Sequence, residues 1–144
     1  NDPQDKSIHV AITTDNNVLI SYCAVVRKTL HHAGKDFDCW GLTGVMTFTP
    51  FVCMGFETRI VDIATKIIDE SGCDIGMFHC SKESKPFYEK SGWEAMENTK
   101  TLTGDVENPE LSDELMMMRF VSKLGKSKRK DFVNTQVYFG EDTW

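Results

Sequence analysis

The first third of the chain alternates apolar and polar residues in a way that predicts three antiparallel strands. Val, Ile, Thr and Tyr are frequent over 8–14 and 18–30, and the Asp-Asn-Asn stretch at 15–17 suits the turn of a β-hairpin. A third strand over 37–48 must stop before Pro50, because proline donates no ladder hydrogen bond. These segments predict a three-stranded meander.

The apolar period then changes from two to 3.6 residues, which predicts an amphipathic helix. One face of this helix carries Ile60, Ile63, Ala64, Ile67 and Ile68. Gly72 suits the position just after its end. The apolar run over 74–80 predicts a central strand, and the helical crossover before it implies parallel pairing with the preceding strand.

The second half of the chain contains shorter predicted elements. A helix over 84–91 should close on Gly92, and strands are predicted over 93–96, 115–121 and 133–139. An acidic loop separates the first two of these strands, and a basic loop, interpreted as a solvated hairpin tip, separates the last two. The order of elements predicts an α+β domain with a mixed sheet.

Size and composition narrow the class of protein. A chain of 144 residues with 40% hydrophobic and 26% charged residues is expected to form one soluble globular domain. No apolar run is long enough to span a bilayer and the first residues are polar, so we expect a cytoplasmic protein with no membrane partner. The chain begins without methionine and soon enters strand-like sequence, which suggests that an N-terminal portion is missing.

The net charge of −6 makes nucleic acid an unexpected partner and favours cationic small molecules or neutral proteins. Simple solubility is the alternative explanation of this charge. Five cysteines without a close pair argue against both a disulfide framework and a zinc site. His79 and Cys80 are adjacent on a predicted strand, so their side chains point to opposite faces and cannot share one metal ion.

The segment from Lys85 to Trp93 (Lys-Pro-Phe-Tyr-Glu-Lys-Ser-Gly-Trp) places Tyr88 on a short helix that ends in glycine and runs into an apolar strand. A phenol with a pKa near 10 can donate a proton to a departing thiolate, although a tyrosine in a Phe-Tyr pair also suits simple packing. This arrangement resembles the GNAT N-acetyltransferases, which keep their thiol-protonating tyrosine in such a place. The resemblance implies an α+β fold with a mixed, mostly antiparallel sheet and helices on both faces, in one domain over 1–144 that lacks the family's first strand and helices.

The resemblance also implies a binding site for acetyl-CoA. The backbone of the third strand would pair with the pantetheine arm, the turn before the long helix would bind the pyrophosphate through its amides, and the second helix would contribute a serine. The implied cofactor-binding residues are Val45, Met46, Thr47, Met54, Gly55, Phe56, Thr58 and Ser84. Val52 and Glu57 stand where the family usually has Gln or Arg and Gly or Ala.

Two further stretches resemble the aminoglycoside 2′-N-acetyltransferase branch of the family. They are Trp-Gly-Leu-Thr-Gly-Val at 40–45 and the final Gly-Glu-Asp-Thr-Trp. This resemblance implies that Asp142 and the carboxylate of Trp144 bind the ammonium groups of the acceptor, with Asp113 as a further carboxylate; a tail held down by a buried tryptophan is the alternative. Thr43 stands in place of the glutamate that acts as a base in this branch. Asp142 acting through water is the candidate base, and an amine that binds already neutral is the alternative.

The sequence therefore predicts an acetyl-CoA-dependent N-acetyltransferase that acts on a primary amine of a cationic small molecule such as an aminoglycoside. Tyr88 would be the general acid. Two alternatives stay open: a non-catalytic GNAT-like module that binds a ligand, and an acetyltransferase for a polyamine or a protein amine. A homodimer is also left open.

Overall fold

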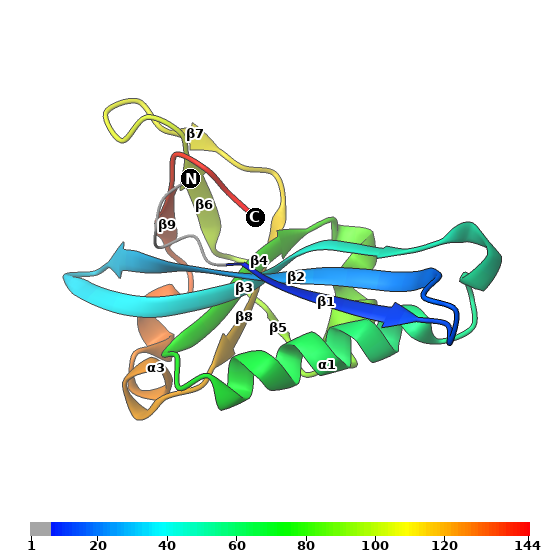
Figure 1. The fold of residues 1–144 in the computed structure, drawn as a ribbon. Helices are drawn as coiled ribbons and strands as arrows, with labels where there is room; N and C mark the ends of the chain where they lie inside the picture. Colours follow the sequence, from blue (N-terminus) through cyan, green and yellow to red (C-terminus); the bar gives the residue numbers. More distant parts are fainter. Residues whose placement is uncertain (1–6) are drawn as a thin grey trace.

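The computed structural model describes residues 7–144, which form a six-stranded mixed sheet and a smaller three-stranded sheet (Figure 1). The larger sheet has the order β1-β2-β3-β4-β8-β5. Its strands are β1 (Ile8–Thr13), β2 (Leu19–His32), β3 (Lys35–Thr47), β4 (Ile75–Cys80), β8 (Leu115–Phe120) and β5 (Glu94–Ala95). Every pair in it is antiparallel except β3 with β4. The predicted α+β class with a mostly antiparallel mixed sheet is confirmed.

The predicted meander is present as β1, β2 and β3, and the Asp-Asn-Asn turn joins the first two strands. Asn17 adopts a positive φ of 62°, which asparagine tolerates better than most residues. The predicted crossover is also confirmed, since the strand after the long helix pairs parallel to β3.

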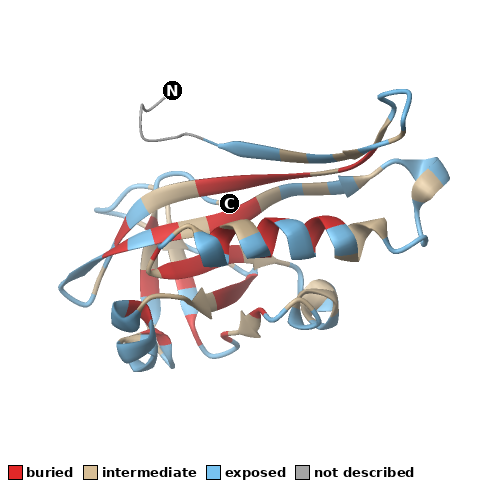
Figure 2. Ribbon diagram, turned by 60° about the horizontal axis from the view of Figure 1, so that its bottom comes forward, coloured by how far each residue is buried: buried red, intermediate tan, exposed pale blue. Residues whose placement is uncertain are grey.

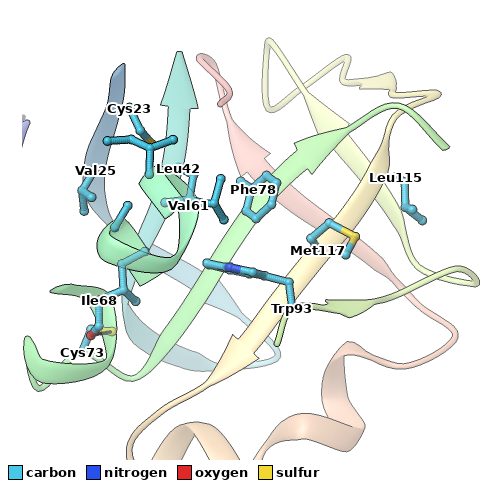
Figure 3. Close-up of a cluster of buried hydrophobic side chains, with 12 residues drawn as sticks. Cys23, Val25, Leu42, Val61, Ile68, Cys73, Phe78, Trp93, Leu115 and Met117 are labelled. Atoms are coloured by element: carbon cyan, nitrogen blue, oxygen red, sulfur yellow. Dashed lines mark hydrogen bonds between the residues drawn. The ribbon is translucent and has the colours of Figure 1, made fainter. Parts of the chain in front are cut away.

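Helix α1 (Phe56–Glu70) lies along β1, β2 and β3 and covers one face of the larger sheet (Figure 2). Its buried residues are Ile60, Val61, Ala64, Thr65 and Ile68. Ile63, predicted to lie on the buried face, is 37% exposed because it lies at the margin of the apolar stripe. Figure 3 shows Phe78 and Trp93 in the cluster of buried side chains on this face, together with Val61 and Leu42.

The opposite face carries a second buried cluster, which includes Leu30, Phe37, Met116 and Phe139. It is covered by the three-stranded sheet in the order β7-β6-β9 and by the 3₁₀ helix η3 (Arg129–Phe132), whose Phe132 is buried. The strands of this sheet are β6 (Lys100–Thr103), β7 (Glu110–Leu111) and β9 (Gln136–Gly140).

The prediction of a basic hairpin tip is wrong. β8 and β9 belong to different sheets, and the basic segment between them forms helix α3 (Lys123–Ser127) and η3. Ser122 caps α3 by accepting a hydrogen bond from the backbone N–H of Gly125 at 3.0 Å. A Cβ at Gly125 would lie 2.0 Å from the Asp74 carbonyl oxygen, so this helix depends on a close approach that local pattern does not reveal.

The second predicted helix is shorter than expected. Residues Lys82–Ser84 form the 3₁₀ helix η2, α2 spans Lys85–Glu89, and a turn through Gly92 (φ 90°) leads into β5. Between β3 and α1 the only regular element among the described residues is the 3₁₀ helix η1 (Thr49–Phe51). No helix among the described residues has the length and apolar character needed to cross a bilayer.

Candidate active site

The parallel pair β3 and β4 separates soon after it begins. Only Cys39 with Ile75 and Trp40 with Gly76 are paired, although β3 continues to Thr47 and β4 to Cys80. Within residues 7–144 no strand pairs with this edge of β3 beyond Trp40. The two strands therefore form a splay that opens toward their carboxyl ends, from which the chain leads to α1 and α2 (Figure 1).

A β-bulge lies on the β3 side of this splay. Tyr22 pairs with Met46 and Ala24 with Thr43, so that Gly44 and Val45 together oppose the single residue Cys23. Gly44 has a φ of 66°, which glycine adopts without steric cost. Bulges bend a strand and redirect its side chains, and this one lies beyond the last pair of β3 with β4.

The backbone predicted to bind pantetheine, Val45 to Thr47, begins in this bulge and runs to the end of β3. Met46 is 44% exposed, and its carbonyl oxygen accepts a hydrogen bond from the Ser21 hydroxyl at 2.9 Å. The Ser21 hydroxyl is also 2.9 Å from the hydroxyl of Thr47. These side-chain bonds fix the last residues of β3 against β2.

The predicted pyrophosphate turn leads directly into α1. Gly55 is its N-cap with a φ of 86°, and no side chain caps the helix. The first amides of a helix have no partner within it, so those of Phe56 and Thr58 are available to a ligand. Met54 is 64% exposed. Glu57 lies in the first turn, where a carboxylate competes with a bound anion for the positive end of the helix dipole.

Tyr88 lies on α2 and its ring packs edge-on against Phe78 at 4.6 Å between centroids. Burial raises the pKa of Tyr88 to about 12, and the nearby thiols of Cys80 and Cys23 add to this shift. The phenol therefore keeps its proton throughout the neutral range. Ser84, predicted to contact the cofactor, lies just before α2, and its hydroxyl is 3.0 Å from that of Ser81.

Trp144 occupies the apex of the splay. Its indole N–H donates to the main-chain oxygen of Met77 at 2.6 Å, and its own main-chain oxygen accepts from the His79 N–H at 3.2 Å. A Cβ at Gly41 of β3 would lie 2.0 Å from the indole nitrogen. The indole is thus held between the two strands, immediately after their last pair.

His79 holds Trp144 in this place. Its Nδ1 is 2.7 Å from the Trp144 main-chain oxygen, which can only accept, so Nδ1 carries the proton. Its Nε2 then accepts from the Thr101 hydroxyl at 2.8 Å. Burial lowers the pKa of His79, which keeps the imidazole neutral at pH 7. Both nitrogens are engaged, so His79 acts as a clamp in this structure rather than as a free base.

Sequence reasoning considered His79 only as a metal ligand and missed this contact. The expectation that His79 and Cys80 face opposite ways is confirmed, because His79 packs against Phe139 and Cys80 against the cluster under α1. Among residues 7–144 no three His, Cys, Asp or Glu side chains are close enough together to hold a metal ion. No local signal pairs residues 65 positions apart, so the bond between His79 and Trp144 could not be predicted.

The residues predicted to bind the acceptor are only partly brought together. Thr43 is half-buried beside the bulge. It lies two residues after Gly41, the residue that borders the Trp144 indole. Asp142 is exposed. Burial lowers the pKa of Lys28, and the negative charge of Asp142 opposes this shift. Asp113 is exposed just before β8, and no ion pair or hydrogen bond among the described residues joins it to Asp142.

The sequence of this chain matches no protein-family model and no curated protein. Its structure is similar to a GNAT-family N-acetyltransferase of Escherichia coli solved in complex with CoA (TM-score 0.60, 13% identity, 91% of this chain and 66% of that one). It is also similar to glucosamine-6-phosphate N-acetyltransferase from Arabidopsis thaliana (TM-score 0.54, 18% identity, 64% and 62%). A third similar structure is a GNAT-family acetyltransferase from Staphylococcus aureus (TM-score 0.54, 10% identity, 81% and 68%).

The chain spans less than two thirds of the length of the first two of these proteins. At these identities the likeness concerns the path of the backbone and not the side chains of a site. The likeness to the Escherichia coli protein extends over 91% of this chain. The fold of this chain is the fold of the GNAT family of N-acetyltransferases.

Proposed function

We propose that this chain binds acetyl-CoA and transfers the acetyl group to a primary amine. The observation that carries this proposal is the splay of β3 and β4, which opens toward the N-terminus of α1 and toward the helix that carries Tyr88. The similar protein from Escherichia coli was solved with CoA, which supports the choice of cofactor.

In this proposal the pyrophosphate binds the free amides of the Gly55 turn, with contacts from Met54, Phe56 and Thr58. The pantetheine arm pairs with the backbone of Val45, Met46 and Thr47, and Ser84 contacts it from the other side. The amine nitrogen attacks the thioester carbonyl directly, the C–S bond breaks, and the Tyr88 hydroxyl gives its proton to the departing thiolate. The thioester is already activated, so positioning supplies much of the rate.

The acceptor we propose is a cationic small molecule such as an aminoglycoside. Asp142 and Asp113 are exposed carboxylates, and the chain carries a net charge of −6, which favours a cationic acceptor. The Trp144 carboxylate would contribute as well, although His79 already binds one of its oxygens. Thr43 cannot serve as a base near pH 7, and Asp142 acting through water is the proposed base. Screening polyamines and peptide amines beside aminoglycosides separates the acceptor classes.

Tyr88→Phe tests the proposal most directly. We expect the variant to fold and to bind acetyl-CoA as tightly as the wild type in titration calorimetry, because the edge-on contact with Phe78 is kept. Turnover should fall by about 10²- to 10⁴-fold, because no general acid then meets the thiolate. Absence of acetyl-CoA binding by the wild type at millimolar concentration would refute the proposal.

A non-catalytic binding module is the second candidate, and the glutamate at position 57 together with Val52 favours it, since neither residue helps to bind phosphate. Thr43→Glu separates the two candidates because it restores a carboxylate base beside the splay. A large gain in turnover would indicate a weakened enzyme. Acetyl-CoA binding without turnover in both forms, across the acceptor screen, would favour the module.

A further inference from the structure

The apex of the splay is closed by a side chain that belongs to neither strand. Trp144 bonds to the carbonyl oxygen of Met77 and the N–H of His79, two groups on the same edge of β4. That edge faces β3, because a Cβ at Gly41 would lie 2.2 Å from the Met77 oxygen. Where the two strands separate, Trp144 therefore makes the hydrogen bonds to the β4 backbone that β3 no longer makes.

Residues from several parts of the chain contact Trp144. The imidazole of His79 holds the main-chain oxygen, the ring of Phe139 packs edge-on against the indole at 4.9 Å, and Gly41 leaves room for it. Trp144 also packs against the buried clusters on both faces of the sheet. A side chain with this many contacts is held in one position.

The proposed function sets the direction in which the cofactor enters. The pyrophosphate turn at Gly55 follows the end of β3, so the phosphates lie at the open mouth of the splay. The pantetheine then runs inward along Val45–Thr47, and the acyl group leads toward the apex. Only Leu42, Thr43 and Gly44 lie between the pantetheine strand and Gly41, which is about 10 Å of strand.

We propose that Trp144 is the end wall of the acyl site and limits the length of the acyl chain that the splay between β3 and β4 accepts. This inference rests on the proposed function. An acetyl thioester fits along the remaining stretch of β3, whereas an octanoyl chain would meet the indole. This wall would make the protein selective for short acyl-CoA thioesters.

The test compares acetyl-CoA, butyryl-CoA and octanoyl-CoA by calorimetry on the wild type, Trp144→Ala and Trp144→Phe. We expect the wild type to bind octanoyl-CoA at least tenfold more weakly than acetyl-CoA. Trp144→Ala should narrow this ratio by tenfold or more, through tighter binding of octanoyl-CoA, and Trp144→Phe should lie between the two. If turnover is measurable, KM for octanoyl-CoA should fall more than kcat changes.

Each other result has a definite meaning. A wild type that binds no acyl-CoA overturns both the proposed function and the wall. A wild type that binds acetyl-CoA and octanoyl-CoA equally, or a Trp144→Ala variant that keeps the wild-type ratio, overturns the wall alone. If Trp144→Ala does not fold, Trp144→Phe with a cooperative thermal transition decides: an unchanged ratio in this variant also overturns the wall.

Discussion

Gly41 has no side chain, and this allows the Trp144 indole to lie between β3 and β4. This residue lies on β3 directly after the last pair with β4, has no Cβ, and faces both the Trp144 indole and the Met77 carbonyl oxygen. Any larger residue would need space that both neighbours already fill. The splay and its apex therefore depend on a glycine whose φ is not in the left-handed region; steric room alone requires it.

Gly41→Ala should destabilise the protein. The added Cβ would lie 2.0 Å from the indole nitrogen and 2.2 Å from the Met77 oxygen, so backbone must move. We expect a loss of about 1–3 kcal/mol in the free energy of unfolding, measured by urea denaturation. Gly34→Ala is the matched control: it has open space and a φ of 76°, and should lose only the cost of that conformation, about 1–2 kcal/mol. A fully stable Gly41→Ala protein would contradict the packing described.

His79 should make the stability depend on pH. Burial lowers its pKa in the native state below the ordinary value of 6.5, so the unfolded chain binds a proton first as the pH falls. The free energy of unfolding should therefore decrease as the pH falls from about 6.5 toward the native pKa of His79. In His79→Asn this part of the slope should vanish, whereas both proteins should show similar slopes between pH 8 and 9. Denaturant titrations over this range provide the measurement, and equal slopes below pH 6.5 would argue against a buried neutral imidazole.

At the scale of elements, α1 is fixed to the sheet by a buried polar contact as well as by its apolar stripe. The Trp93 indole N–H donates to the Thr65 hydroxyl at 2.9 Å, and both residues are buried. At its C-terminal end the helix is also joined to β8, where Arg119 makes a bidentate contact with the carboxylate of Asp69. The helix that presents the Gly55 turn is therefore anchored along its length.

Thr65→Val should weaken this anchoring. The substitution keeps the shape of the side chain but leaves the Trp93 N–H without its acceptor in a buried place, which costs about 1–3 kcal/mol. Thr65→Ser keeps the hydroxyl and should be less destabilised than Thr65→Val in the same urea titration. The opposite order would show that the methyl group matters more than the hydrogen bond.

The elements differ in how far their sequence predicts them. β1, β2, β3, α1 and β4 have long or strongly periodic patterns, and local pattern was enough to predict them. α3 and η3 were missed because they depend on distant partners: Asp74 accepts from the Ser122 hydroxyl at 2.7 Å and its carbonyl oxygen crowds Gly125. β6 and β7 were missed because their pairing partners are remote or very short.

The same limit applies to the candidate site. Tyr88 and the Gly55 turn stand out in the sequence because helix ends carry local signals. The splay does not, since it consists of backbone groups that lack a partner, and only the resemblance to a family implied that the backbone of the third strand is free to bind a ligand. The position of Trp144 at the apex could be found only from the structure, because its partners Met77 and His79 lie far from it along the chain.

At the scale of the whole molecule, the proposed function predicts that acetyl-CoA stabilises the protein by binding between the splayed strands β3 and β4. At a ligand concentration of 100 times Kd we expect the free energy of unfolding to rise by about 2.7 kcal/mol. Thermal or urea unfolding with and without ligand provides the measurement. ATP is the control ligand, because it carries phosphates without a pantetheine arm and should stabilise less at equal concentration. Equal stabilisation by both ligands would mean that the β3 backbone takes no part.

Trp144 packs against the buried clusters on both faces of the large sheet, so a change in either cluster can alter how this residue is held. Thermodynamic linkage is reciprocal: if a ligand between β3 and β4 stabilises the bound position of Trp144, then a substitution that stabilises this position raises the affinity for the ligand. Residues on the face of the sheet opposite α1 could then change ligand affinity without contacting the ligand.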